Sequence, residues 1–295
     1  MKFDELLFKR MAEDKMLAAQ MVTYLMLPAI FYQNVPDDTD IGWKDKQYPR
    51  ICFDYNLQAD IERKTAGKLC VSVFCVSNED VMPVRVESEV KRVLKDIILT
   101  PDELNPYCLT WSKSEYFDIG RYERKDSDTM ICGVDIYFDI IEYPSQETTS
   151  PDPVAGLNCF LKNLYPSSYV IGLDKLPDII DTNIESPVIY SRLDISEKES
   201  STNTVVWFSV RIAVHVLCSD NAVRKKLVMA IANTLSVQGE IILLDKSPMT
   251  VAHLKVSHTA DYLTQGQLNI TCRYGILKPC EKKHVLIGGK IITNY

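Results

Sequence analysis

The sequence contains no long apolar run. No window of its 295 residues approaches the roughly 18 consecutive apolar residues of a membrane-spanning helix, so we expect none. Asp4 and Glu5 follow the first residues, unlike a secretory signal peptide. The nine cysteines are odd in number and scattered, which predicts reduced thiols in a protein made in a cytoplasm. A formal net charge of −7 argues against a protein that grips nucleic acid, because such binding relies on clustered Lys and Arg.

The motifs of catalysis are also missing. The sequence has no Gly-rich phosphate loop, nucleophile elbow, zinc-ligand spacing or kinase signature. Reactive side chains that lie near one another are separated by odd spacings along expected strands, which places them on opposite faces: His215 and Cys218, Cys70 and Cys75, His253 and His258. Glu87 and Glu89 are about 200° apart on an expected helix, as on a solvated face. We therefore expect no catalytic, cofactor-binding or metal-ligating residues, and a protein that is not an enzyme.

What the sequence does contain is an internal duplication. Pro49 and Pro187 begin similar extended runs and are 187 − 49 = 138 residues apart, and the same offset relates Val93 to Ile231 in the helices that follow. A fixed offset across two elements indicates a repeat. Upstream, Leu27-Pro28 aligns with Leu176-Pro177, which leaves 11 extra residues in the first copy between Asn34 and Pro49. Downstream, residues 130–138 align with residues 267–276.

Hydrophobic periodicity then predicts the elements of each copy. The first contains a helix over about 2–27, a loop over 34–48, strands at 50–58, 67–77, 114–122 and 128–142, and a helix at 84–98. The second contains helices at 154–164 and 222–235 and strands at 187–194, 204–217, 249–258 and 266–277. The expected fold is α+β, with two tandem related domains, each a mainly antiparallel four-stranded sheet packed against helices. Their expected bounds are 1–143 and 154–280, with a Pro-, Ser- and Thr-rich linker at 144–153.

Two regions outside the repeat are candidates for interfaces. In the loop, Trp43 is either an interface anchor or a lid over the first core. After the repeat, residues 281–295 read as a β-hairpin with Gly288-Gly289 at its turn. This extension either closes the edge of its own sheet or adds to a neighbour's sheet, and we favour the neighbour because the first copy manages without it. The interface candidates are Asp37, Asp38, Asp40, Trp43, Val285, Ile287 and Ile291.

The first copy resembles the tail terminator, or tail completion, proteins of tailed bacteriophages. The matching order is an N-terminal helix, Leu-Pro with an acidic loop, Tyr48-Pro49-Arg50-Ile51, a hairpin into Leu69–Val76, a helix at Glu87–Ile98, and a closing pair that ends in Asp135-Ile136-Tyr137-Phe138. The match covers about residues 1–142, and residues 151–278 more loosely. Members usually hold one such domain, so the doubled domain departs from the family.

The resemblance implies a structural virion protein of the tail or neck, assembled in the host cytoplasm. Such proteins form a hexameric ring that caps the tail tube and docks it to the head connector or neck protein. The implied partners are further copies of the chain, the tube protein and the connector, while DNA passes through without specific binding and no membrane or cofactor takes part. Charge reversal at Asp37, Asp38 and Asp40 is expected to impair assembly. Two alternatives stay open: a tube-like baseplate hub working as a pseudo-sixfold trimer, and a small-molecule-binding module or enzyme with a cleft between the domains.

Overall fold

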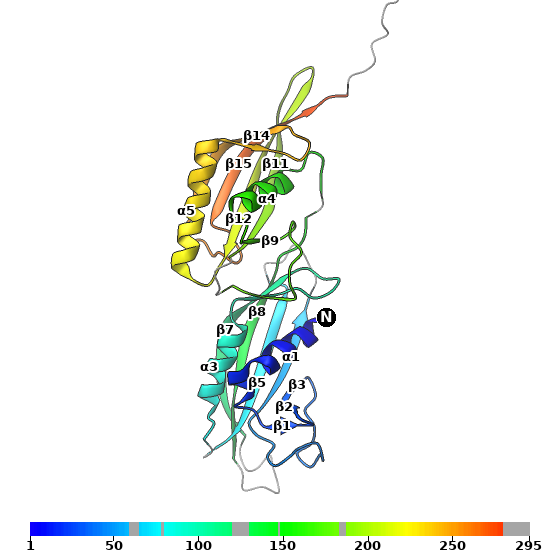
Figure 1. The fold of residues 1–295 in the computed structure, drawn as a ribbon, viewed down its shortest axis with the longest axis vertical. Helices are drawn as coiled ribbons and strands as arrows, with labels where there is room; N and C mark the ends of the chain where they lie inside the picture. Colours follow the sequence, from blue (N-terminus) through cyan, green and yellow to red (C-terminus); the bar gives the residue numbers. More distant parts are fainter. Residues whose placement is uncertain (59–64, 78–79, 120–129, 147, 183–186, 280–295) are drawn as a thin grey trace, which may run out of the picture.

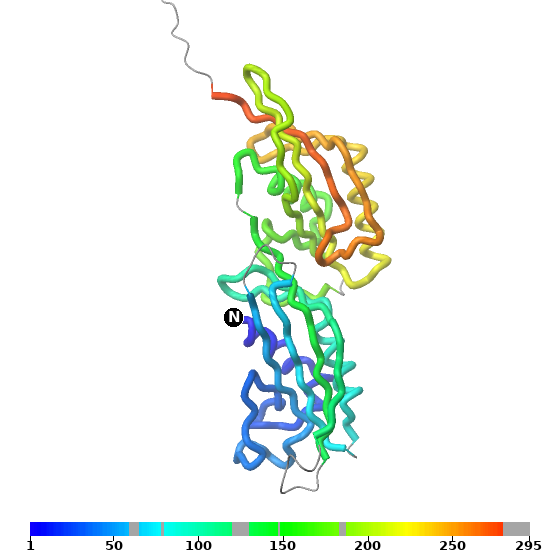
Figure 2. The backbone as a smooth tube through the Cα atoms, turned by 180° about the vertical axis from the view of Figure 1, so that it is seen from behind, coloured from blue at the N-terminus to red at the C-terminus, as the bar shows by residue number. Residues whose placement is uncertain are grey.

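The chain folds into two α+β units that lie end to end along the longest axis of the molecule (Figure 1). The structure is a computed structural model and describes residues 1–58, 65–77, 80–119, 130–146, 148–182 and 187–279. Each unit is a sheet with its helices against one face, and the view from behind shows the strands in front of the helices (Figure 2). No helix of the described residues is long and apolar enough to cross a membrane.

The first sheet has seven strands in the order β10–β6–β7–β8–β5–β4–β3. Their bounds are β3 (Ile30–Tyr32), β4 (Arg50–Leu57), β5 (Gly67–Val76), β6 (Ile97–Leu99), β7 (Tyr107–Ile119), β8 (Ile131–Glu142) and β10 (Ile179–Asp181). Helices α1 (Phe3–Glu13), α2 (Lys15–Ala18) and α3 (Pro83–Leu94) cover one face, and a separate two-stranded ribbon joins β1 (Thr23–Tyr24) to β2 (Leu27–Pro28).

The second sheet has six strands in the order β13–β14–β15–β12–β11–β9. Their bounds are β9 (Tyr169–Val170), β11 (Val188–Ser201), β12 (Val205–Leu217), β13 (Glu240–Ile242), β14 (Pro248–Val256) and β15 (Leu268–Leu277). Helices α4 (Pro153–Leu164) and α5 (Asn221–Gln238) pack on it. Both helices begin at an Asp whose carboxylate accepts backbone N–H groups, Asp152 for α4 and Asp220 for α5, which satisfies donors that a helix start leaves free.

The α+β class is confirmed, whereas the four-stranded antiparallel sheet is wrong. Both sheets are larger and mixed, because β3 pairs with β4 and β9 pairs with β11 in parallel. The additional strands have two or three residues each, too few to show an alternation of apolar and polar residues. Their shortness also limits the unpaired backbone that each sheet edge presents.

The repeat is visible in the strand order. Six strands of the first sheet, β6–β7–β8–β5–β4–β3, correspond to β13–β14–β15–β12–β11–β9 of the second. The helices α3 and α5 keep the offset of 138, because they begin at residues 83 and 221 and bury Val93 and Ile231. β5 and β12 begin at residues 67 and 205, but the core-facing residues are odd-numbered in β5 and even-numbered in β12, so the offset does not hold residue by residue in these strands. The Leu-Pro correspondence is wrong, because Ile179–Asp181 pairs with β6 of the first sheet while β9 takes the place equivalent to β3.

Two local expectations also fail. The helix expected over about 2–27 ends as α2 at Ala18, because Asp14 interrupts it and caps a new short helix by accepting from the N–H groups of Met16 and Leu17. β5 is central, as expected, but only one of its faces is fully buried. Helices cover a single face of the sheet, so the side chains on its other face stay partly exposed.

A buried cluster joins the two units. It contains Ile98, Cys108, Ile141 and Tyr143 from the first unit and Ile171, Ile180, Val188, Tyr190, Leu217 and Leu263 from the second half of the chain. β10 follows the expected linker in the sequence, but it adds to the edge of the first sheet, where Ile180 lies opposite Ile98. The domain bounds stay a prediction, and the expected hairpin at 281–295 lies outside the described residues.

Candidate interaction surface

The acidic loop is held by its own carboxylates. Asp38 accepts from the Arg50 guanidinium (2.6 Å) and from the Tyr48 hydroxyl (3.2 Å). Asp40 accepts from the N–H of Gly42 (2.7 Å) and from the Tyr24 hydroxyl (3.1 Å). These contacts fix the fold of the loop, so charge reversal there would disturb the loop itself and would not separate folding from assembly.

Trp43 is buried within the loop region, although it does not belong to the cluster that forms the first core. Its side chain is only 8% exposed, its indole N–H donates to the backbone oxygen of Asp37 (2.8 Å), and its ring packs edge-on against Tyr24 and Phe31. The Arg50 guanidinium lies 5.7 Å from the centre of the Trp43 ring, within the range of a cation–π contact. In the described chain Trp43 therefore closes the inserted loop and is not an exposed anchor. Asp37 is exposed beside it and folds a local turn with Thr39.

An apolar tip projects from this loop region and was not expected from the sequence. The apolar tip consists of Leu25, Met26 and Leu27, which are 66%, 89% and 55% exposed, with the fully exposed Ile41 near it. Leu25 and Met26 form the two-residue turn between β1 and β2, and both have positive φ, 44° and 71°. Such a turn favours Asn and Gly, and each residue with a side chain there costs about 1–2 kcal/mol. Exposed apolar residues on a strained turn are typical of a contact site.

An apolar groove runs beside the tip, between α1 and β3. Its volume is about 620 Å³, and Phe8, Ala12, Leu27, Tyr32 and Phe53 supply its apolar lining. The rim carries three acids, Asp4, Glu5 and Glu13, and one cation, Lys9. β3 is the last strand of its sheet, and no described strand lies on its outer side. The groove thus combines an open strand edge with apolar walls, which is the arrangement that binds extended peptide segments.

The second unit presents a different surface at the opposite end of the molecule (Figure 1). The outer part of the β11–β12 hairpin, from Asp194 onward, is mostly exposed and extends beyond the buried part of its sheet. Arg211 pairs with Asp194 (2.7 Å) across the hairpin. Arg273 pairs with Glu199 (2.6 Å) and covers the ring of Trp207 (4.4 Å to its centre). This hairpin is polar, unlike the apolar tip.

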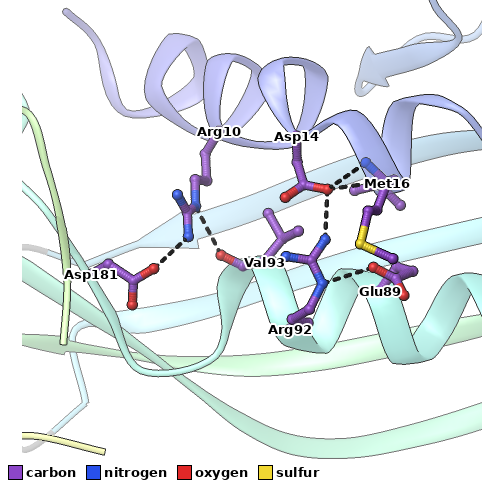
Figure 3. A network of polar contacts seen from close by, with 8 residues as sticks. Arg10, Asp14, Met16, Glu89, Arg92, Val93 and Asp181 are labelled. Atoms are coloured by element: carbon purple, nitrogen blue, oxygen red, sulfur yellow. Dashed lines mark hydrogen bonds and ion pairs between the residues drawn. The ribbon is translucent and has the colours of Figure 1, made fainter. Parts of the chain in front are cut away.

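A charged hollow of about 960 Å³ lies between α1, α2 and the segment around β10, which belongs to the first sheet. Its walls pair with one another, as Figure 3 shows: Arg10 donates to Asp181 (3.0 Å) and to the backbone oxygen of Val93 (3.1 Å), and Arg92 bridges Asp14 (2.6 Å) and Glu89 (2.8 Å). A small-molecule site is usually an apolar pocket with a few converging polar groups. This hollow is instead lined mainly by charged side chains, of which Arg10, Asp14, Arg92 and Asp181 are paired, so it does not match such a site.

Two of the reactive side chains are deeply buried. Burial raises the pKa of the Cys272 thiol to about 12 and lowers the pKa of His215 to about 4. No group of three or more His, Cys, Asp or Glu among the described residues could hold a metal ion. The solvated face expected for Glu87 is wrong, because Glu87 is 7% exposed and accepts from the Tyr116 hydroxyl and from Lys91 (2.6 Å).

Three of the predicted interface residues, Val285, Ile287 and Ile291, lie outside the described part of the chain. The other four lie in one loop, and the apolar tip near that loop is the feature that sequence reasoning missed. An apolar Leu-Met pair at positive φ carries no sequence signal for a turn. No protein-family model matches the chain, and the comparison with curated proteins gives no match either.

Proposed function

We propose that this chain is a structural subunit of a phage tail or tail-like particle, and that its copies form a ring that caps the tail tube and joins it to the head or neck. The apolar tip of the first unit carries the proposal, because a solvent-exposed Leu-Met-Leu on a strained turn is costly unless a partner covers it. The unit that bears the tip is also the one whose sequence resembles the tail terminators.

The distribution of surfaces supports a closed ring. The apolar tip and the β11–β12 hairpin differ in chemistry and lie at opposite ends of the molecule. A subunit that contacts its neighbours through two different surfaces makes heterologous contacts, which close into rings when the rotation between copies allows it. The net charge of −7 suits a channel that DNA passes without sticking.

A trimeric baseplate hub is the second candidate, and the shared strand order of the two units favours it. Three chains would then supply six similar units around one axis. That arrangement needs the two units side by side at one level of a ring. Here they lie end to end and are joined by a buried cluster and by the added strand β10. This geometry favours six chains over three.

The test is the mass of the purified chain in solution, together with negative-stain images at high concentration. Six copies of the 33.6 kDa chain weigh about 200 kDa, and a trimer about half of that. Six-fold rings of the larger mass support the terminator, and three-fold rings support the hub. A chain that stays monomeric at all concentrations, and also when mixed with tail tubes, contradicts both.

A matched pair of variants tests whether assembly depends on the apolar tip. Met26 and Val237 are 89% and 87% exposed, and Val237 lies at the end of α5, in the other unit. Met26→Lys should reduce the fraction of chain in rings, because it places a charge in the covered contact. Val237→Lys should leave that fraction unchanged. Equal effects of the two substitutions would mean that the tip has no specific role.

A further inference from the structure

The groove between α1 and β3 is shaped for an extended segment. Phe53 and Tyr32 form its floor, with ring centres 5.4 Å apart, and Phe8 and Ala12 form the helical wall. The N–H of Gln33 donates to Phe53 and the N–H of Ile51 donates to Ala29, so β3 directs the backbone of residues 29 and 33 toward β4. By the alternation of a strand, the backbone groups of Ile30 and the N–H of Tyr32 face outward, where an added strand would bond, while the Tyr32 oxygen accepts from the N–H of Asn34 (2.6 Å).

The second copy of the repeat shows what fills the equivalent place. By the 138-residue offset of the sequence repeat, Ser191 aligns with Phe53 (53 + 138 = 191), and it lies at a site between α4 and the strands β9 and β11. There the interdomain linker runs alongside. The Tyr190 hydroxyl donates to the backbone oxygen of Pro144 (3.0 Å), and the N–H of Leu193 donates to the side-chain oxygen of Gln146 (2.9 Å).

The volumes of the two sites differ accordingly. About 50 Å³ remains between α4, its strands and the linker, against about 620 Å³ between α1 and β3. The same architectural position is therefore occupied by an extended segment in one copy and open in the other, among the described residues. The open copy is also the one whose floor carries the large apolar side chain, Phe53, in place of the aligned Ser191.

We infer that the groove between α1 and β3 binds residues 284–293 of a second copy of this chain as a single added strand, in place of the hairpin expected from Gly288-Gly289. In that segment Val285, Ile287 and Ile291 share one face by the two-residue period of a strand, which suits an apolar groove. Residues 281–295 contain three lysines and one glutamate, a net charge of +2, and the groove rim carries three acids and one lysine. Opposite charges around an apolar contact favour this pairing.

The donor belongs to another copy because the segment cannot return to its own groove. β15 runs from Leu268, near the junction of the units, to Leu277, which pairs with Val205 at the far end of the second sheet. Its ten residues span about 33 Å. The seven steps from Leu277 to His284 span at most about 25 Å, which is less than β15 alone, and the groove lies beyond it in the first unit.

The test uses a fluorescent peptide of residues 281–295 and the full chain carrying Ile287→Lys and Ile291→Lys, so that its own segment does not compete. We expect the peptide to bind, and binding to slow exchange of the Ile30 and Tyr32 amide protons. Adding Ala12→Trp to the receptor fills the groove and should weaken binding at least tenfold. Lys226→Trp, at an exposed position of α5, is the matched control and should change nothing.

Two further variants test the same contact if Ala12→Trp affects folding. Glu13→Lys at the exposed rim should weaken binding severalfold, while a peptide carrying both Lys substitutions should bind at least tenfold more weakly than the parent peptide. Failure of the peptide to bind, or equal binding by the Ala12→Trp receptor, overturns the inference. The inferred contact rests on the proposed function only in that copies of the chain associate. If rings form but the peptide does not bind, the inferred contact is wrong and the proposed function is unaffected.

Discussion

His215 should make the junction between the two units sensitive to acid. Its side chain is 2% exposed and lies among the rings of Tyr143 and Tyr190, with centres 6.2 and 5.5 Å away. Its Nδ1 lies 3.0 Å from the backbone oxygen of Tyr262, to which it donates, and its Nε2 has no hydrogen-bond partner among the described residues. Burial therefore lowers the pKa of His215 from 6.5 to about 4.

The sign of the effect follows from proton linkage. The folded chain holds His215 neutral between about pH 4 and pH 6.5, whereas the unfolded chain protonates it, so acid favours unfolding over that window. A pKa difference of about 2.5 corresponds to about 3.4 kcal/mol once the pH is below both values. Between pH 7.5 and pH 5.0 the loss in the free energy of unfolding is about 2 kcal/mol.

The assay is urea denaturation of the parent and of His215→Phe and His215→Gln at the two pH values. Neither replacement titrates in this range, so each should lose about 2 kcal/mol less than the parent between pH 7.5 and pH 5.0. Comparing the loss within each protein cancels the cost of the substitution and the titration of other groups. His253→Phe, at an exposed position of β14, is the matched control and should keep the parent's loss. A parent and His215 variants with the same loss would refute the reasoning.

Three further predictions concern other parts of the fold. Replacing Leu25 and Met26 by Asn-Gly should relieve the strained turn and raise the free energy of unfolding by about 1–2 kcal/mol in urea denaturation. The same change removes the apolar tip and should reduce ring formation. A destabilised variant would show that the turn is not strained. A double-mutant cycle of Arg10→Ala and Asp181→Ala should give a coupling of about 0.5–1 kcal/mol at low salt that shrinks at high salt, and a coupling of zero would show that the pair does not hold β10. The Cys272 thiol has a pKa of about 12 and is 0% exposed, so it should resist alkylation at pH 8 in the folded chain and react in urea. Mass spectrometry would detect the alkylated cysteine. Rapid labelling of Cys272 in the folded chain would contradict its burial.

The long elements of this fold could be predicted because their periodicity extends over many residues. The strand expected at 204–217 is observed as Val205–Leu217, and the helix expected at 154–164 as Pro153–Leu164. The two-residue and three-residue strands could not be predicted, since their pairing depends on which sheet edge lies near them in space. β10 is the clearest case: its sequence aligns with that of β3, but its partner is β6 of the first sheet.

The environments of two side chains could not be predicted for a different reason. Glu87 looks like an exposed helical acid in the sequence, and it is buried because Tyr116 on β7 reaches it from 29 residues away. Trp43 looks like an exposed loop aromatic, and it is covered by Tyr24 from the region that the sequence assigned to a helix. In both cases a distant element decides the environment of the side chain, and local patterns carry no information about it.

The comparison of the two copies indicates where function should be sought. Strand order, the main hairpins and the helices α3 and α5 are common to both units, so these features specify the fold. The first copy alone has the inserted loop, the apolar tip and the open groove beside β3, and the second alone has the linker lying against α4 and the segment that follows β15. A duplicated domain keeps what folding requires, whereas surfaces that differ between copies are free to acquire separate contacts. The open groove and the segment after β15 both contain apolar residues and have opposite net charge, which is why they are paired in the inferred contact.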